Sequence, residues 1–576
     1  MPPKTSDSTS WHLKRADGVY ILALLAGIVV LYRGVLQLWW CLDDFYQIEF
    51  ITAHPPSEYL FSPAVWQQLP TRLLTPFLFF SLDIDRHLDG LRPELFYAHQ
   101  LIAFMAAMIA MYLALRPWLE PSWSAIACAI IFLGTPSSSI VQQLMQRHYA
   151  EGIIFACVTV LSFVRACRTG RVGLAVLCVG AYVAATLEKE IFVPLPLLLF
   201  ALPLERNEPR RKLLWALGGA LVFYSAWRYH MLGTFGGGYA WVVSPSDYPR
   251  LVMELPRKLF TALGGVNAPV VSILMLSLLA AFTVYASTRR ESLWVTAMAL
   301  AAAVAPIVPA STVMENRYAL GISILLAVGF AVGCSRLAER GRPWRNAAVG
   351  VALAVVSLAL ISNRTDWRST FSRMKQMSAE GRGFVTLGAN DTLAHPRIPP
   401  AAMSQLVWMK RELHGSEGSD WYYDDIRLCT EPLASRRIWE LDQNVMKLHD
   451  ITPTIAARAH VYCASIRNDV PLSAGFTHQG GVLGWKLGPY EPGKYSFVLA
   501  NGRVSYEMPR AQRYDLGPLP GITLRVRYES PDGWVTYSPE LQLDFARQHQ
   551  WIWERPGLNR HRSVTQATSC NLARCG

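Results

Sequence analysis

Long apolar runs are the feature that most constrains how this chain can fold. The first, from Val19 to Trp40, has the length of a membrane-spanning helix, and Trp39 and Trp40 at its far end are typical of a membrane interface. The sequence predicts about eleven such spans, some of them shorter than the roughly 20 residues that cross a bilayer unaided. They lie near residues 19–40, 95–115, 122–135, 150–166, 172–188, 190–204, 213–232, 267–287, 292–310, 318–334 and 345–362.

Composition separates the chain from ordinary soluble enzymes. Of its 576 residues, 52% are hydrophobic and 17% are charged, whereas a soluble enzyme carries about a quarter charged residues. The net charge of +12 is compatible with nucleic-acid binding, but Lys and Arg cluster in short loops between the apolar runs. That pattern sets membrane orientation, and we expect no nucleic-acid partner.

The basic loops predict one orientation in the membrane. Residues 1–18 are polar and lack the features of a cleavable signal peptide, so we expect them to form a cytoplasmic tail. With this choice every basic cluster lies inside, as the positive-inside rule requires, and eleven crossings place everything after Ser362 outside. The clusters are Lys14 and Arg15; Arg165, Arg168 and Arg171; Arg206, Arg210, Arg211 and Lys212; Arg289 and Arg290; and Arg336, Arg340, Arg342 and Arg345.

The last third of the chain, residues 363–576, has no membrane-length apolar run. Residues 475–543 contain short alternating runs, among them Tyr495–Val498, Ile522–Tyr528 and Trp534–Tyr537, separated by Gly-containing turn signals. Met403–His414 and Ala434–Leu448 have a helical pattern. We therefore expect a multi-span α-helical membrane domain, residues 19–362, followed by an extracytoplasmic α+β domain.

Four cysteines fall in this C-terminal segment: Cys429, Cys463, Cys570 and Cys575. An even number in an oxidising compartment allows two disulfides, and the expected topology places the segment in such a compartment. Four free thiols are the alternative. The other six cysteines lie mostly within the spans and behave as small apolar residues.

Adjacent carboxylates, Asp43 and Asp44, stand just after the first span, in an outer loop from residue 41 to 93. A carboxylate pair at the membrane surface is poorly placed for packing and well placed for proton transfer. The alternative is that one of them caps a short helix from Phe45 to Thr52, a common role for aspartate. One aspartate can cap while its neighbour reacts, and we favour catalysis.

Charged residues also recur near the membrane in the other outer loops. A single such Arg is as readily explained by a side chain that reaches the interface, and Glu188-Lys189-Glu190 by a salt-bridged turn. Five loops that each carry a cation, with acids among them, predict instead a polar cavity at the outer leaflet that binds a lipid-linked phosphate. These residues are Arg72; Arg147, His148 and Tyr149; Glu188, Lys189 and Glu190; Arg228; and Glu315 and Arg317.

Over residues 19–335 the chain resembles the GT-C glycosyltransferases, integral membrane enzymes that take a sugar from a polyprenyl-phosphate carrier. The order of the matching strings and their placement on one face of the membrane carry the resemblance. The strings are Asp43-Asp44-Phe45-Tyr46, Thr71-Arg72-Leu73-Leu74, Phe96-Tyr97-Ala98-His99, Gln146-Arg147-His148-Tyr149, Leu187-Glu188-Lys189-Glu190 with Pro194-Leu195-Pro196, Trp227-Arg228-Tyr229 and Glu315-Asn316-Arg317-Tyr318.

The resemblance implies a mechanism with inversion at the sugar. Asp43 or Asp44, with a slight preference for Asp43, would be the general base on an acceptor hydroxyl. The leaving phosphate would be stabilised by Arg72, Arg147, Lys189, Arg228 and Arg317. The sugar or these cations would be oriented by His148, Tyr149, Glu188, Glu190 and Glu315. The donor carries one phosphate, so we expect no metal and no other cofactor, and no cluster in the sequence has the spacing of metal ligands.

The resemblance also sets expectations for location and substrates. It places the enzyme in the bacterial inner membrane, with its active site outside the cytoplasm. The acceptor would be a glycan, a lipid or a surface protein. Pentofuranose transferases of this kind often have a carbohydrate-binding C-terminal domain, which makes a donor such as an arabinose lipid one expectation.

Two other functions fit parts of the sequence. A lipid-linked sugar transporter or flippase also needs a polar cavity, but transporters commonly show internal repeats, and none is visible here. A non-catalytic assembly protein would use its aromatic-rich outer domain to bind envelope glycans, although Trp and Tyr are more often core residues.

Overall fold

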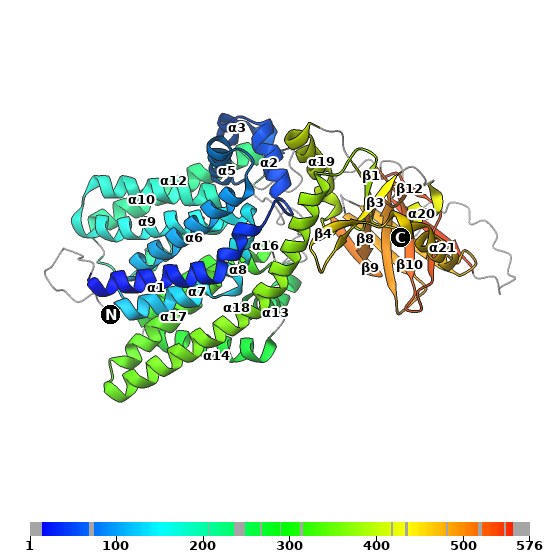
Figure 1. The fold of residues 1–576 in the computed structure, drawn as a ribbon. Helices are drawn as coiled ribbons and strands as arrows, with labels where there is room; N and C mark the ends of the chain where they lie inside the picture. Colours follow the sequence, from blue (N-terminus) through cyan, green and yellow to red (C-terminus); the bar gives the residue numbers. More distant parts are fainter. Residues whose placement is uncertain are drawn as a thin grey trace, which may run out of the picture. The chain divides into compact units, whose positions relative to one another are not determined.

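The computed structural model describes residues 14–67, 74–205, 207–234, 248–264, 268–288, 290–310, 315–415, 419–431, 436–479, 482–515, 521–545 and 549–556. The chain divides into two compact units, Met1–Gly381 (unit 1) and Arg382–Gly576 (unit 2). Where it is described, unit 1 is helical and the strands belong to unit 2 (Figure 1). The predicted fold class, a multi-span helical membrane protein with a strand-containing C-terminal domain, is confirmed.

Each of the eleven predicted spans contains helical residues, although some, such as 19–40, 190–204 and 292–310, are divided between two helices. Proline in the first turn begins many of these helices, since proline has no N–H to leave unsatisfied there. Among the described residues, six helices are long and apolar enough to cross a membrane, or seven if the bent pair α7–α8 is one span. The first elements are α1 (Arg15–Tyr32), η1 (Arg33–Gln37), α2 (Asp44–Ala53), α3 (Pro56–Phe61), α4 (Pro63–Gln67), α5 (Pro76–Asp89), α6 (Pro93–Leu115), α7 (Pro121–Phe132), α8 (Thr135–Gln142), η2 (Leu144–Gln146) and α9 (Arg147–Thr169).

The remaining elements of unit 1 are α10 (Val172–Glu188), η3 (Glu190–Phe192), α11 (Leu195–Ala201), α12 (Glu208–Leu232), α13 (Tyr248–Gly264), α14 (Pro269–Ala286), α15 (Arg290–Val304), α16 (Ile307–Ala310), η7 (Asn316–Ala319), α17 (Leu320–Ala338) and α18 (Arg342–Phe384). Helix α18 continues well past Ser362, the predicted end of the last span. Its extension still buries apolar side chains at helical spacing, among them Trp367, Met374 and Met377, and Trp367 contacts the ring of Tyr32. The compact units therefore divide later in the chain than the predicted boundary at residue 363.

Unit 2 begins with a small mixed sheet. Its order is β2-β1-β3-β4, with β1 parallel to both neighbours and β4 antiparallel to β3. The predicted helix at Met403–His414 is present, whereas the helix predicted at Ala434–Leu448 is wrong. The elements are β1 (Asp391–Ala394), α19 (Pro400–His414), β2 (Asp420–Tyr422), α20 (Ile426–Thr430), β3 (Arg437–Asp442), β4 (Lys447–Asp450) and α21 (Thr452–Ser465).

Two contacts explain why residues 437–450 form strands instead. Ile438 is fully buried in the register of β3 with Thr392 of β1, a partner that no local pattern reveals. The Asp442 carboxylate accepts from the N–H groups of Asn444 and Val445, which turns the chain back into β4. Tertiary pairing here overrides the local helical pattern.

The second part of unit 2 is a pair of antiparallel sheets, and the alternating runs predicted strands here. One has the order β11-β10-β7-β8, with β12 also on β10, and the other has the order β13-β5-β6-β9. Phe476 and Trp485 from the second sheet meet Phe497 from the first, so the core lies between them. The elements are β5 (Leu472–Gln479), β6 (Val482–Gly488), β7 (Lys494–Leu499), η8 (Ala500–Gly502), β8 (Val504–Met508), β9 (Ala511–Asp515), β10 (Ile522–Glu529), β11 (Val535–Tyr537), β12 (Leu541–Leu543) and β13 (Gln550–Arg555).

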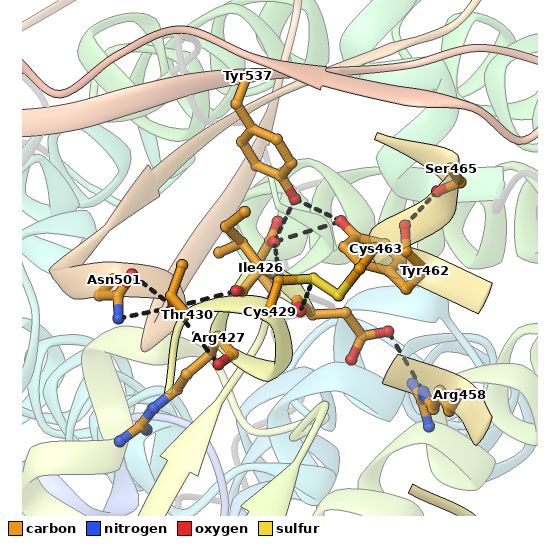
Figure 2. The surroundings of a disulfide bond; sticks show 12 residues. Ile426, Arg427, Cys429, Thr430, Arg458, Tyr462, Cys463, Ser465, Asn501 and Tyr537 are labelled. Atoms are coloured by element: carbon orange, nitrogen blue, oxygen red, sulfur yellow. Dashed lines mark hydrogen bonds and ion pairs between the residues drawn. A yellow bond between two sulfur atoms is a disulfide. The ribbon is translucent and has the colours of Figure 1, made fainter. Parts of the chain in front are cut away.

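A disulfide joins Cys429 on α20 to Cys463 on α21 (Figure 2). Beside it, the hydroxyls of Tyr462 and Tyr537 hydrogen-bond each other, which ties α21 to strand β11. The structure therefore pairs two of the four candidate cysteines. Cys570 and Cys575 lie outside the described residues.

Replacing Cys429 and Cys463 together by Ser is expected to lower the free energy of unfolding of unit 2 by about 2–4 kcal/mol, because the crosslink limits the unfolded chain across a separation of 34 residues. Pulse proteolysis of the full chain in urea, following the C-terminal fragment, measures this change. Cys334→Ser, a buried position in unit 1, is the matched control. Equal urea midpoints for the double variant and the unsubstituted chain would contradict the expectation.

Candidate active site

The start of helix α2 gives the two adjacent aspartates different environments. Asp43 occupies the N-cap position, but its side chain makes no capping hydrogen bond, and it is exposed. Asp44 is 2% exposed, and its Oδ2 accepts from the N–H of Cys41 at 3.1 Å and from the hydroxyl of Tyr97 at 3.3 Å. Asp44 therefore holds the turn, and the carboxylate of Asp43 is available for chemistry.

Both carboxyl groups have raised pKa values. Burial raises the pKa of Asp44 to about 7, the nearby charge of Asp43 adds to this, and the hydrogen bond from the Cys41 N–H opposes it. Burial also raises the pKa of Asp43, and the charge of Arg317 opposes the rise. Solvent still reaches the side chain of Asp43.

The backbone just before this pair is strained. Leu42 has φ of +54°, a left-handed conformation that costs an L-residue other than Gly or Asn about 1–2 kcal/mol. Strain of this kind persists where the surrounding structure fixes it, and it is enriched at functional sites. Here it places Asp43 and Asp44 at the start of α2 directly after η1 and a short extended segment.

A second part of the site forms where α10 breaks into η3. Lys189 is extended between these two helices, and its Nζ lies 3.5 Å from Oε2 of Glu190. The other carboxylate oxygen of Glu190, Oε1, accepts from Nη2 of Arg228 on α12 at 2.9 Å. Nη1 of Arg228 also lies 3.4 Å from the hydroxyl of Tyr224. Glu190 thus bridges two cations, one at the break between α10 and η3 and one on α12.

Arg317 on η7 connects this group to Asp43. Its Nη1 lies 2.8 Å from Oε2 of Glu315 and 3.4 Å from Oε1 of Gln143. Its charge acts on both Asp43 and Lys189. We call Asp43, Lys189, Glu190, Arg228, Glu315 and Arg317 the charged cluster. It unites residues that lie far apart in the sequence.

Polar side chains beside the charged cluster lack internal partners. His148 is 5% exposed, it lies within electrostatic range of Lys189 and Arg317, and it contacts the ring of Tyr149. Within the described part of the chain, neither ring nitrogen of His148 and neither amide atom of the fully buried Gln142 has a hydrogen-bond partner. A buried polar group without a partner costs about 1–3 kcal/mol, so these groups favour a polar ligand or water next to them.

Arg147 and Glu188, predicted to bind the phosphate and the substrate, lie in a different network from the charged cluster. Arg147 is fully buried, and its guanidinium donates to Asp85 at 2.5 Å, to Ser81 at 3.1 Å and to the Phe96 carbonyl at 2.8 Å. Glu188 is 2% exposed, and Glu151 and Arg147 are its electrostatic neighbours. With its donors engaged, Arg147 braces α5, α6 and α9 against one another.

A large cavity lies in unit 1. It has a volume of about 960 Å³, and most of the side chains around it are apolar. It follows α17 from Tyr318 and Leu320 to Arg336 and Glu339, and α9, α11 and α15 contribute to its walls. The 19 residues of α17 span about 28 Å, close to the hydrocarbon thickness of a bilayer. Tyr318 lies directly after Arg317, and Ile191 on the wall lies directly after Glu190.

Comparison with known proteins gives structural likenesses only. No protein-family model and no curated protein matches the chain. The structure of ArnT from Cupriavidus metallidurans, apo and bound to undecaprenyl phosphate, is similar at a TM-score of 0.38 and 14% identity, over 75% of this chain and 94% of that one. An Archaeoglobus fulgidus oligosaccharyltransferase tethered with an acceptor peptide is similar at a TM-score of 0.42 and 12% identity, over 86% and 76%. At these values the likenesses carry no conclusion about the activity of this chain.

Some residues of the site carried no assigned role in the sequence. Tyr97, which hydrogen-bonds Asp44, lies in one of the matching strings, but the sequence assigned it no role. Tyr224 and Gln143 are recognised as part of the site only through their contacts with Arg228 and Arg317. Arg72, an expected phosphate ligand, lies outside the described residues. Within the described ranges, no group of three or more His, Cys, Asp or Glu side chains is placed to hold a metal ion.

The strain at Leu42 can be tested with a matched pair of polar substitutions. Asn tolerates a positive φ, whereas β-branched Thr, of similar size, does not. Leu42→Thr is therefore expected to be less stable than Leu42→Asn by about 1 kcal/mol. The thermal unfolding midpoint of the purified chain in detergent measures the difference. Identical midpoints for the two variants would show that the backbone at Leu42 is not strained.

Proposed function

We propose that the protein is an inverting glycosyltransferase of the GT-C kind, which moves a sugar from a polyprenyl-phosphate donor to an acceptor hydroxyl. One observation carries the proposal: an apolar cavity follows α17 over about the thickness of a bilayer, Arg317 precedes that helix within a group of cations, and the charge of Arg317 acts on the exposed carboxylate of Asp43. The apolar cavity suits a polyprenyl chain, the cations suit its phosphate, and the carboxylate suits an acceptor hydroxyl.

The donor lies along α17 in this proposal. Its prenyl chain fills the cavity, where burial of apolar surface contributes about 25 cal/mol per Å². Its phosphate reaches the cavity end at Tyr318 and meets Arg317, Lys189 and Arg228. These cations are paired with Glu315 and Glu190, so the phosphate enters a site whose cations are already oriented.

Transfer then follows from the position of Asp43. Its carboxylate takes the proton of the acceptor hydroxyl, and the oxygen attacks the anomeric carbon. The bond to the phosphate oxygen breaks, polyprenyl phosphate leaves, and the sugar inverts. Arg317 and Lys189 stabilise the negative charge that develops on the leaving phosphate. His148, with Tyr149 beside it, offers unpartnered ring nitrogens to the sugar hydroxyls.

The reaction takes place on the extracytoplasmic side of a bacterial inner membrane in this proposal. The disulfide of unit 2 supports this side, because disulfides persist in oxidising compartments. We propose a glycan, a lipid or a surface protein as the acceptor and a pentofuranose such as arabinose as one candidate sugar. The proposed reaction uses no metal and no other cofactor.

Asp43→Asn is expected to lower kcat/KM for sugar transfer by at least about 10²-fold, because a general base contributes 10²–10⁴-fold. Asp44→Asn should cost less than about tenfold, since an amide oxygen can still accept from Cys41 and Tyr97. The assay measures transfer of labelled sugar from synthetic undecaprenyl-phosphate hexoses and pentoses. A large loss with Asp44→Asn and a small one with Asp43→Asn would contradict the assignment.

The pH profile of the same reaction provides an independent control. A general base acts when ionised, so kcat/KM should fall as the pH drops through the pKa of Asp43. Because burial raises that pKa, the acid limb should lie above the ordinary aspartate value of 3.8. An acid limb at or below that value would exclude Asp43 as the base.

Blocking the cavity should impair long-chain donors selectively. Ala299 lines it, and Leu300, the next residue of α15, is 47% exposed and does not. Ala299→Trp is expected to raise KM for an undecaprenyl-phosphate sugar at least about tenfold, with a smaller effect on a geranyl-phosphate donor. Leu300→Trp is the matched control. Equal effects of Ala299→Trp on both donors would show that the prenyl chain binds elsewhere.

A further inference from the structure

The parallel part of the sheet in unit 2 has an edge where ligands bind in many α/β folds. From β1 the chain crosses through α19 to β2 on one side, and then through α20 to β3 on the other. The connections therefore separate at the carboxyl end of β1. Crevices at such switch points are the common ligand sites of open parallel sheets.

A polar pocket of about 760 Å³ lies at this edge. His395 and Arg397 follow β1, Tyr423 follows β2, and Glu440 and Asp442 end β3. All lining residues except Pro396 and Leu441 carry a polar group; Gln443, Asn444 and His449 complete the wall. The volume is within the range of small-molecule sites, but the lining is more polar than is usual for apolar ligands.

The wall of the pocket is held rigid by ion pairs. The Nε2 atom of His395 lies 2.8 Å from Oδ1 of Asp425, and Nε of Arg458 lies 3.3 Å from Oδ2 of the same carboxylate. Nη1 of Arg458 reaches Oε2 of Glu440 at 3.3 Å. His395 also has φ of +46°, a strained conformation that the backbone keeps while its N–H donates to the Tyr422 carbonyl.

The chemistry of the lining favours a neutral ligand with many hydroxyl groups. The lining carries one guanidinium group, from Arg397, and the carboxylates of Glu440 and Asp442, so no surplus of positive charge selects a phosphate. Carboxylates accept, guanidinium groups donate, and the amides of Gln443 and Asn444 do both. Sugar hydroxyls need donors and acceptors together, whereas a peptide would need apolar pockets for its side chains.

We infer that this pocket is a saccharide-binding site that holds the acceptor glycan. The role as acceptor site rests on the proposed glycosyltransferase function, but saccharide binding does not, because it needs neither donor nor transfer. A saccharide site in this pocket favours a glycan over a protein as the acceptor.

The test measures binding and transfer separately. The full-length protein in detergent, without donor, is applied to an array of arabinofuranosyl, mannosyl, galactosyl, glucosyl and N-acetylglucosaminyl oligosaccharides. The best-retained oligosaccharide is then titrated by calorimetry. His449→Ala and Asn444→Ala change exposed rim residues and leave the ion pairs intact, and each is expected to weaken binding at least about tenfold. His414→Ala, an exposed histidine outside the pocket, should bind normally.

The outcomes distinguish this inference from the proposed function. Retention that both rim variants lose supports the pocket, even if no transfer is found. The inference is overturned if no oligosaccharide is retained, or if the rim variants and His414→Ala retain it equally. Neither outcome affects the transfer assays on Asp43. Transfer to a protein acceptor with no saccharide bound would also overturn it.

Discussion

The candidate site depends on the pairing of cations within a helical bundle. Lys189 and Arg228 are nearly buried, and an unpaired charge in such a place carries a desolvation penalty of several kcal/mol. Glu190 relieves both at once, since its two oxygens face different helices, and Glu315 does the same for Arg317. This pairing explains how α10, η3, α12 and η7 can bring like charges together. It also keeps the guanidinium groups oriented.

The cost of burying a charge also distinguishes the two aspartates. Successive residues at the start of a helix point in directions about 100° apart, so one carboxylate of an adjacent pair can face inward while the other faces solvent. Asp44 turns toward Cys41 and Tyr97, and burial then favours its neutral form. Asp43 stays exposed, and the charge of Arg317 acts on it. An exposed carboxylate and a buried one thus arise from one dipeptide.

Much of this arrangement could be predicted from the sequence, because it depends on local pattern. The apolar runs predicted the positions of the helices, and the alternating runs predicted β7 and β10. The charged residues in the outer loops predicted that Lys189, Arg228 and Arg317 lie near Asp43. Features set by distant partners could not be predicted. Nothing in the sequence near Arg147 indicates that Asp85 and Ser81 engage its donors. The strands at residues 437–450 require β1 as a neighbour, and the left-handed φ values of Leu42 and His395 require the contacts that fix them.

The cavity along α17 has a kinetic consequence. In the proposed function the prenyl chain of the donor lies in this cavity, so the donor reaches the site from the membrane, where it diffuses in two dimensions. The quantity that sets occupancy is then the mole fraction of the donor among the surrounding lipids, and the volume of the surrounding solution is irrelevant. Two cells with the same number of donor molecules but different membrane areas would saturate this protein to different degrees.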